Sequence, residues 1–290
     1  MAHQERKKIM KTWKKIVLGV SLISLFLGGG LVAWGYSQGG LTDLQNQTKS
    51  EQDYVKKEVK DFNKIDIKSS SYNVLIKNGE VDKATLSYYQ KTKNPIDTSV
   101  KDGQLTINDN NSELDSTSNK HINFFGLKDL VRLSTLNKEV RNKTIVITLP
   151  KKQTIDFLKV DLATGNLDLS NSTIKQADIN LNVGDLTFTK MIVSNLKANL
   201  DVGSVDSDHT LFTNSDLSIA MGDYSGDNLI FNGHNKLDVT SGDIEIALKD
   251  YTLNVQADSH SGEVDITNNL KISKDNTLTI TSDLGDITVE

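Results

Sequence analysis

A series of glycine-following residues is the part of this sequence whose types and spacing could do chemistry. The glycines recur at intervals of 19 to 23 residues, and the residues directly after them are Asn166, Asp185, Ser204, Asp223, Asp243, Glu263 and Asp286. If the chain repeats one structural unit at this interval, the carboxylates of Asp223, Asp243 and Glu263 stack about 5 Å apart and repel one another. A calcium ion would relieve this repulsion, because it takes carboxylate and carbonyl oxygens.

Turn capping is the alternative role for this acidic series. In that role each side chain accepts hydrogen bonds from backbone amides of its bend and otherwise faces solvent. The nonapeptide signature of calcium-binding solenoids is absent. We therefore favour turn capping over a metal site and expect no metal or other cofactor.

Catalytic arrangements are not predicted. His121, His209, His234 and His260 stand at unrelated offsets from the glycines, so a repeating structure would not gather them. The chain has no H-E-x-x-H, P-loop or G-x-G-x-x-G motif, and it has no cysteine. A solenoid lyase or glycosidase needs carboxylates and basic residues that converge on one groove, yet no basic residue shares the register of the acidic series. The sequence therefore predicts a protein that is not an enzyme.

The elements that must position these residues are short strands. Apolar and polar residues alternate on both sides of most of these glycines, as in "INLNVGDLTF" (179–188), and a third apolar patch falls between successive glycines. Three strands in ~20 residues describe one coil of a β-solenoid. We predict an all-β solenoid of about 7–8 coils, with repeats over residues 151–290. Its corner glycines are Gly165, Gly184, Gly203, Gly222, Gly242, Gly262 and Gly285.

Residues 63–150 are predicted to form an N-terminal β region. Alternating apolar residues over 65–76 indicate one more coil, with Ser70 in the place of the glycine and Tyr72 and Val74 facing inward. Asp102–Gly103 favours a tight hairpin. The stretch "KTIVITLP" (143–150) predicts a strand that Pro150 ends.

A capping insert is expected at 109–140. Its apolar stretch (122–136) could place several side chains on one helical face: Ile122, Phe124, Phe125, Leu127, Leu130 and Val131. The insert either caps the exposed backbone edge of the first coil or presents an apolar surface to a membrane or a partner protein. At the other end, Ile287 and Val289 are nearly the last residues, so we expect an uncapped edge there that can pair with a second copy.

The first 62 residues differ from the rest. Residues 1–15 are a basic tail, and 16–36 carry no charge over a length that can cross a membrane as a helix. The positive-inside bias places the tail in the cytoplasm and the rest outside. A cleaved signal peptide is the alternative, although its small-residue cleavage site is poorly matched. Residues 37–62 are predicted to be a polar stalk, with a helix from about 42 to 60.

The part beyond the predicted anchor is acidic. The first 36 residues hold six of the 33 basic and one of the 38 acidic residues, which leaves 27 basic against 37 acidic residues, a net charge of −10. Such a domain is a poor candidate for binding nucleic acid and a fair one for cationic partners. Acidity that merely keeps an exported protein soluble explains the same composition.

The run of "SGDI"-type corners, behind a "TIVITLPK"-like strand and an N-terminal anchor, resembles the putative-adhesin family of Gram-positive bacteria. Its better-known members are the LiaG-like and LiaX-like envelope-stress proteins, and the resemblance covers about 63–290. It implies a membrane-anchored β-solenoid at the cell surface, associated with responses to membrane-active antimicrobial peptides. The family is one of unknown function and supplies no catalytic residues.

The predicted function is therefore that of an extracellular, single-pass binding or sensing scaffold of the cell envelope. It would serve an envelope-stress or antimicrobial-peptide response, or adhesion, and cationic peptides or another envelope protein are the expected partners. One alternative is a structural or regulatory partner of another membrane protein, such as a stress-sensing system. A third is a glycan-binding surface, which is disfavoured because outward positions offer few aromatic side chains for stacking on sugars.

Overall fold

The structure is a computed structural model that describes residues 52–91, 95–109 and 143–290. The elements assigned in these three ranges are all strands, and no helix there is long and apolar enough to cross a membrane. Gln52–Glu290 forms one compact unit. The predicted basic tail, anchor, most of the stalk and nearly all of the capping insert, including Ile122, Phe124, Phe125, Leu127, Leu130 and Val131, lie outside the described residues.

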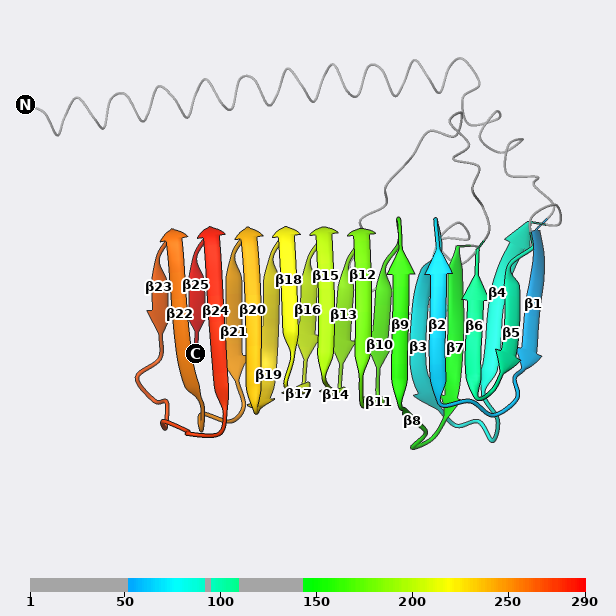
Figure 1. Ribbon diagram of the computed structural model, residues 1–290, viewed down its shortest axis with the longest axis horizontal. Coiled ribbons are helices and arrows are strands. Elements are labelled where there is room, and N and C mark those ends of the chain that lie inside the picture. The colour runs from blue at the N-terminus through cyan, green and yellow to red at the C-terminus, as the bar shows by residue number, and fades with distance from the viewer. Residues whose placement is uncertain (1–51, 92–94, 110–142) are drawn as a thin grey trace, which may run out of the picture. The chain divides into compact units, whose positions relative to one another are not determined.

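The described chain winds into coils whose strands stack on three faces (Figure 1). Face B is a 10-stranded sheet. Its strands, in spatial order, are β22 (Asn254–Ser261), β24 (Thr277–Leu284), β20 (His234–Ser241), β18 (Asp216–Met221), β15 (Leu196–Val202), β12 (Ala177–Val183), β9 (Phe157–Leu162), β2 (Lys64–Ser69), β6 (Gln104–Asn108) and β5 (Asp97–Lys101).

Faces A and C together form a 15-stranded sheet, because one long strand, β19 (Tyr224–Asn232), belongs to both. Face A otherwise contains β1 (Gln52–Glu58), β4 (Thr85–Lys91), β7 (Thr144–Pro150), β3 (Asn73–Gly79), β10 (Leu167–Ser170), β13 (Leu186–Thr189), β16 (Val205–Asp208), β21 (Ile244–Leu248), β25 (Ile287–Val289) and β23 (Val264–Ile266). Face C contains β8 (Thr154–Ile155), β11 (Thr173–Ile174), β14 (Ile192–Ser194) and β17 (Leu211–Thr213). The prediction of three strands in a coil is confirmed for the central coils.

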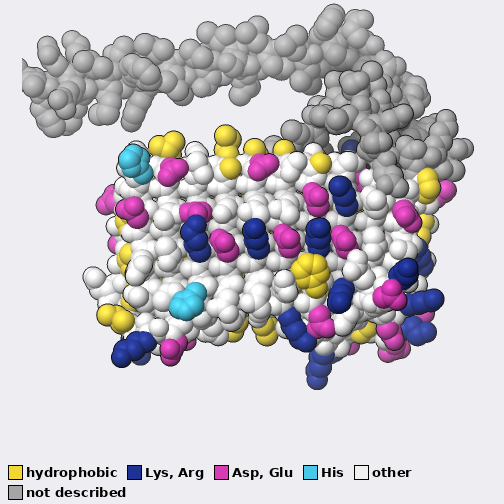
Figure 2. Space-filling view, viewed as in Figure 1, with side chains coloured by type: hydrophobic (Ala, Val, Ile, Leu, Met, Phe, Trp, Pro, Cys, Tyr) yellow, Lys and Arg dark blue, Asp and Glu magenta, His cyan; other side chains and the backbone are white. Residues whose placement is uncertain are grey.

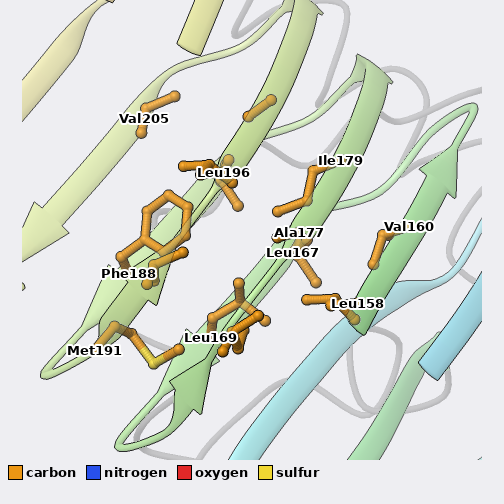
Figure 3. Close-up of a cluster of buried hydrophobic side chains, with 14 of the residues drawn as sticks. Leu158, Val160, Leu167, Leu169, Ala177, Ile179, Phe188, Met191, Leu196 and Val205 are labelled. Carbon is orange, nitrogen blue, oxygen red and sulfur yellow. The ribbon is translucent and has the colours of Figure 1, made fainter. Parts of the chain in front are cut away.

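Neighbouring coils pair in parallel and in register, so equivalent side chains form rows along the stack. Ile179 of β12, for example, lies between Val160 of β9 and Ala198 of β15. Inward-facing residues of the three faces fill a continuous core (Figure 3). Burying one large apolar side chain stabilises the fold by about 1.5–3 kcal/mol, and the inward rows repeat that contribution from coil to coil.

The corner glycines lie where one coil approaches the next most closely. From Gly165 to Gly285 all but Gly262 adopt φ between 143° and 150°, which an L side chain rarely adopts. A Cβ on Gly203 would lie 1.9 Å from the carbonyl oxygen of Gly184 in the preceding coil. The predicted role of these glycines as corners is therefore correct, and the reason includes close approach as well as backbone angle.

The extra coil predicted at 65–76 is present, with one correction. β2 pairs with β9 and β3 pairs with β10, so this segment stacks directly on the first regular coil. The atom that a Cβ on Gly165 would meet is the carbonyl oxygen of Tyr72. Tyr72, rather than Ser70, therefore occupies the place of the glycine, and Val74 and Ile76 face the core.

The predicted helix from about 42 to 60 is wrong over its described part. Residues 52–58 form β1, which pairs antiparallel with β4 along its whole length. Val55 and Val59 pack against the core from this edge of the sheet. Their four-residue spacing, which also fits one face of a helix, therefore belongs here to an edge strand and the residue that follows it. The predicted Asp102–Gly103 hairpin is confirmed, because β5 and β6 pair antiparallel across these two residues, both of which have positive φ.

The last two coils exchange places relative to their sequence order. β24 pairs with both β20 and β22, and β25 pairs with both β21 and β23. The expected open edge at Ile287 and Val289 is therefore wrong, because β25 is an interior strand. The inward residues are consistent with the exchange: Leu278 and Ile280 are fully buried in β24, whereas β22 offers the smaller, partly buried Ala257.

We expect Gly203→Ala to lower the free energy of unfolding by about 3 kcal/mol or more, because the new methyl group meets a backbone oxygen that cannot move aside. Gly103→Ala is the control. Ala at position 103 must also adopt a positive φ, but its methyl group meets no backbone atom. This substitution should therefore lower the free energy of unfolding by only about 1 kcal/mol. Urea unfolding of both variants makes the comparison, and equal losses would contradict the close-approach argument.

Candidate functional site

The residues after the corner glycines form one hydrogen-bonded series along the stack. In each coil the side chain accepts a hydrogen bond from the backbone N–H of the equivalent residue in the next coil, with N···O distances of 2.7–3.3 Å. In spatial order the series runs through Asn73, Asn166, Asp185, Ser204, Asp223, Asp243, Asp286 and Glu263. The side chains do accept backbone amides as predicted, but the predicted partner is wrong, because each of these bonds comes from the bend of the neighbouring coil and not from its own.

The calcium site considered for Asp223, Asp243 and Glu263 has a different geometry from the one expected. Asp286 lies between Asp243 and Glu263, because the last two coils exchange places. The Oδ1 atoms of Asp223, Asp243 and Asp286 each accept an amide N–H, which offsets part of their mutual repulsion. Among the described residues no group of three or more His, Asp or Glu side chains could hold a metal ion.

A surface that we call the corner ridge combines this acidic series with exposed apolar side chains. Val202, Met221 and Leu284 each stand directly before a corner glycine, and their exposed fractions are 37%, 59% and 55%. They lie in one register row of face B, with Ser241 between Met221 and Leu284. The exposed acidic members of the ridge are Asp201, Asp223, Asp243, Glu263, Asp283 and Asp286.

One outward row on the flat part of face B is electrically balanced. Pairing between coils aligns residues of opposite charge in one row, Asp66, Lys159, Asp178, Lys197, Asp216 and Lys236. Figure 2 shows this alternation of positive and negative side chains across the face, with apolar side chains along one edge. Because the charges cancel within the row, it attracts neither cations nor anions strongly. The corner ridge is the more acidic of these two surfaces.

A second corner, between faces A and C, carries a groove that the sequence did not reveal. It has a volume of about 170 Å³ and is lined by residues that include Lys190, Ile192, His209, Leu211, Ile230 and Lys249. None of the described residues that line it is acidic. Asn171, Lys190, His209 and Asn228 all have φ between 49° and 55°. Their regular 19-residue spacing was the signal that could have located this corner.

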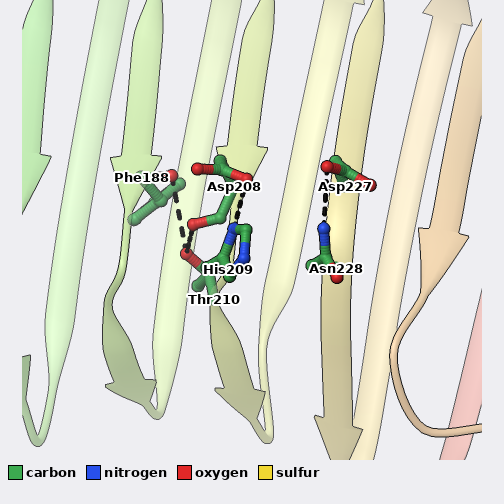
Figure 4. A network of polar contacts seen from close by, with 6 residues as sticks. All are labelled: Phe188, Asp208, His209, Thr210, Asp227 and Asn228. Atoms are coloured by element: carbon green, nitrogen blue, oxygen red, sulfur yellow. Dashed lines mark hydrogen bonds and ion pairs between the residues drawn. The ribbon is translucent and has the colours of Figure 1, made fainter.

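Asp208, His209 and Thr210 at this corner have the composition of a catalytic triad but not its geometry (Figure 4). The imidazole Nδ1 of His209 lies 2.6 Å from Oδ1 of Asp208. The hydroxyl of Thr210 is buried and donates to the backbone oxygens of Asp208 and Phe188. It is therefore directed at backbone carbonyls rather than at the imidazole, so no activated nucleophile is assembled here.

A buried carboxyl group lies on the outward side of face A. Asp168 stands in one row with Leu75 and Thr187, and all three are buried. Burial raises the pKa of Asp168 to about 7, while the charge of Lys77 acts in the opposite direction. Glu245 in the same row is exposed. Desolvation of this kind makes the charged form of a carboxyl group costly.

The parallel, in-register stacking of coils defines a β-solenoid, and its aligned rows of side chains form repeating surfaces. The Toastrack DUF4097 family model matches residues 62–290, and the chain belongs to this family. No curated protein matches the chain.

Solved structures give a more distant likeness. A "putative cell adhesion protein" from Clostridium sporogenes is 14% identical with a TM-score of 0.35, covering 82% of this chain and 99% of that one. A "putative adhesin" from Bacteroides fragilis is 15% identical with a TM-score of 0.36, covering 83% and 98%. A "putative lipid binding protein" from Parabacteroides distasonis is 10% identical with a TM-score of 0.34, covering 83% and 98%.

We expect the stability of the protein to fall as the pH rises from about 4 to 7. The folded state keeps Asp168 protonated to about pH 7, whereas in the unfolded chain this carboxyl group ionises near its ordinary pKa of 3.8. Over this window the folded state binds the extra proton, so raising the pH favours unfolding by ~2–4 kcal/mol.

Asp168→Asn should remove this slope and raise the urea midpoint at pH 8. Glu245→Gln, which changes an exposed carboxylate of the same row, is the control and should leave the slope intact. Parallel pH profiles of the wild type and Asp168→Asn would contradict the assignment to Asp168.

Proposed function

We propose that this protein is a non-enzymatic binding scaffold, anchored by residues 16–36 and displayed outside the cell, that captures cationic partners along the corner ridge. The observation that supports it best is the juxtaposition of exposed Val202, Met221 and Leu284 with exposed carboxylates. Amphipathic cationic peptides match this surface, because they carry apolar and positive side chains together.

The distribution of charge supports the corner ridge as the binding surface. The balanced row on face B cancels its own field, whereas the exposed carboxylates of the corner ridge have no Lys or Arg in their register to offset them. The resemblance to envelope-stress proteins agrees with a role in the response to membrane-active peptides, and adhesion uses the same kind of display. In either setting the protein binds its partner and does not change it chemically.

The first test measures binding of a synthetic Lys/Leu amphipathic peptide to the full-length chain in detergent micelles. Affinity should fall steeply as salt rises, because the ion pairs are solvent-exposed. Simultaneous replacement of Asp223, Asp243 and Asp286 by Asn should weaken binding about tenfold. The corner should survive this change, because Asn166 already serves as the acceptor in its own coil through its amide oxygen.

A matched control changes the net charge by the same amount on the balanced row. Asp66, Asp178 and Asp216 are replaced together by Asn, and binding should weaken by about twofold or less, because these side chains lie away from the ridge. Equal losses in the two triple variants would contradict the corner ridge as the site. Binding that is lost only when residues 1–51 are removed, which leaves β1 in place, would favour a regulatory partner of another membrane protein.

The predicted orientation is tested by single cysteines, since the natural chain has none. A membrane-impermeant maleimide should label intact cells that carry Thr240→Cys, at an exposed position of β20. The same reagent should not label Ala2→Cys, because the basic tail is expected in the cytoplasm. The reverse pattern would contradict the orientation, and a labelled chain released into the medium would indicate cleavage of the anchor.

A further inference from the structure

The end of the solenoid formed by β22 and β23 has backbone groups directed away from the fold. β22 pairs only with β24 and β23 only with β25 among the described strands (Figure 1). Asn254 donates its N–H to the carbonyl of Asn276, on the β24 side. Alternation along the strand therefore directs the N–H and C=O groups of Val255, Ala257 and Ser259 to the open side. Such an edge can accept another strand.

Lys and Pro, which commonly discourage strand addition, are absent from this edge strand, and its one acidic residue is Asp258. β1, at the far end of face A, carries Lys56 and Lys57, and β5, at the far end of face B, ends at Lys101. β22 contains neither Lys nor Pro. Apolar side chains near it are uncovered, since Val264 and Ile272 are 38% and 85% exposed. The β22 end is therefore open in both its backbone and its apolar surface.

We propose that β22 pairs antiparallel with β22 of a second copy, about a two-fold axis that passes through Ala257. In this register Ala257 faces its symmetry mate, and Val255 faces Ser259. These are the residues whose backbone groups point outward, so each pair can exchange both of its N–H···O bonds. A two-fold contact uses the same surface on both copies, so assembly closes at the dimer.

Charge selects this register over its neighbour. With Ala257 on the axis, Gln256 faces Asp258 and Asn254 faces His260, so no like charges oppose each other. A shift that places Asp258 on the axis brings two carboxylates directly opposite, which destabilises an antiparallel pair. The partner is thus a second copy of this chain, and the inference concerns assembly rather than the ligand of the corner ridge.

The first experiment uses Ala257→Cys in the otherwise cysteine-free full-length chain in detergent micelles. Opposed residues of a hydrogen-bonded antiparallel pair have Cα atoms about 5.5 Å apart, within the range of a disulfide. Mild oxidation should therefore give a covalent dimer on a non-reducing gel. Thr279→Cys, one strand inward on β24, is the control and should remain monomeric. No dimer from Ala257→Cys, or equal dimer from both variants, would overturn the proposal.

The second experiment changes the charge opposite Asp258. Gln256→Asp should weaken the dimer about fivefold in analytical ultracentrifugation, and Gln256→Lys should strengthen it by a similar factor, because each dimer contains two such pairs. Thr279→Asp adds the same charge one strand away and should have a smaller effect. A wild-type chain that stays monomeric at every concentration, or equal shifts for Gln256→Asp and Thr279→Asp, would refute the register. Peptide binding to the corner ridge should be unchanged in all of these variants.

Discussion

The close approach of one glycine corner to the next is the constraint on which the rest of this structure depends. In each coil, the carbonyl oxygen of the preceding corner lies close to the position that a Cβ would occupy. The carbonyl oxygen of Gly184, for example, lies at this position for Gly203. Only a residue without a Cβ allows the coils to pack at the spacing of hydrogen-bonded strands. Once the corners are stacked, the three faces have a defined register, and every other repeated residue must form a row.

Rows explain how this simple repeat produces different surfaces. Asp178 and Lys197 alternate on face B, and their row is neutral. Asp223 and Asp243 recur at the corner instead, where amide hydrogen atoms offset their repulsion and solvent reaches their free oxygens. The same backbone thus cancels charge on a flat face and concentrates it on a projecting corner. The net charge of each surface is therefore decided by which register position repeats a charge.

Most of the architecture could be predicted from the period of the glycines and the alternation around them. The exchange of the last two coils could not be predicted from this pattern, because 254–266 and 277–289 both fit it. Only the sizes of their inward residues, such as Ala257 against Ile280, favour one order. The stripe that includes Val55 and Val59 was misassigned to a helix because the decisive partner, β4, is distant in sequence. The second corner was missed because Lys190 interrupts the series of Asn171, His209 and Asn228, whose residue types do favour a left-handed turn.

The exchange of the last coils also bears on the order in which the chain can fold during synthesis. Residues 254–266 leave the ribosome before 277–289, yet their place in the stack exists only after the later segment has docked on β20 and β21. Vectorial growth from the N-terminus therefore stops at β21, and the final turns close in a single late step. That step needs residues 277–289, so β22 and β23 gain their strand partners only when this later segment has docked.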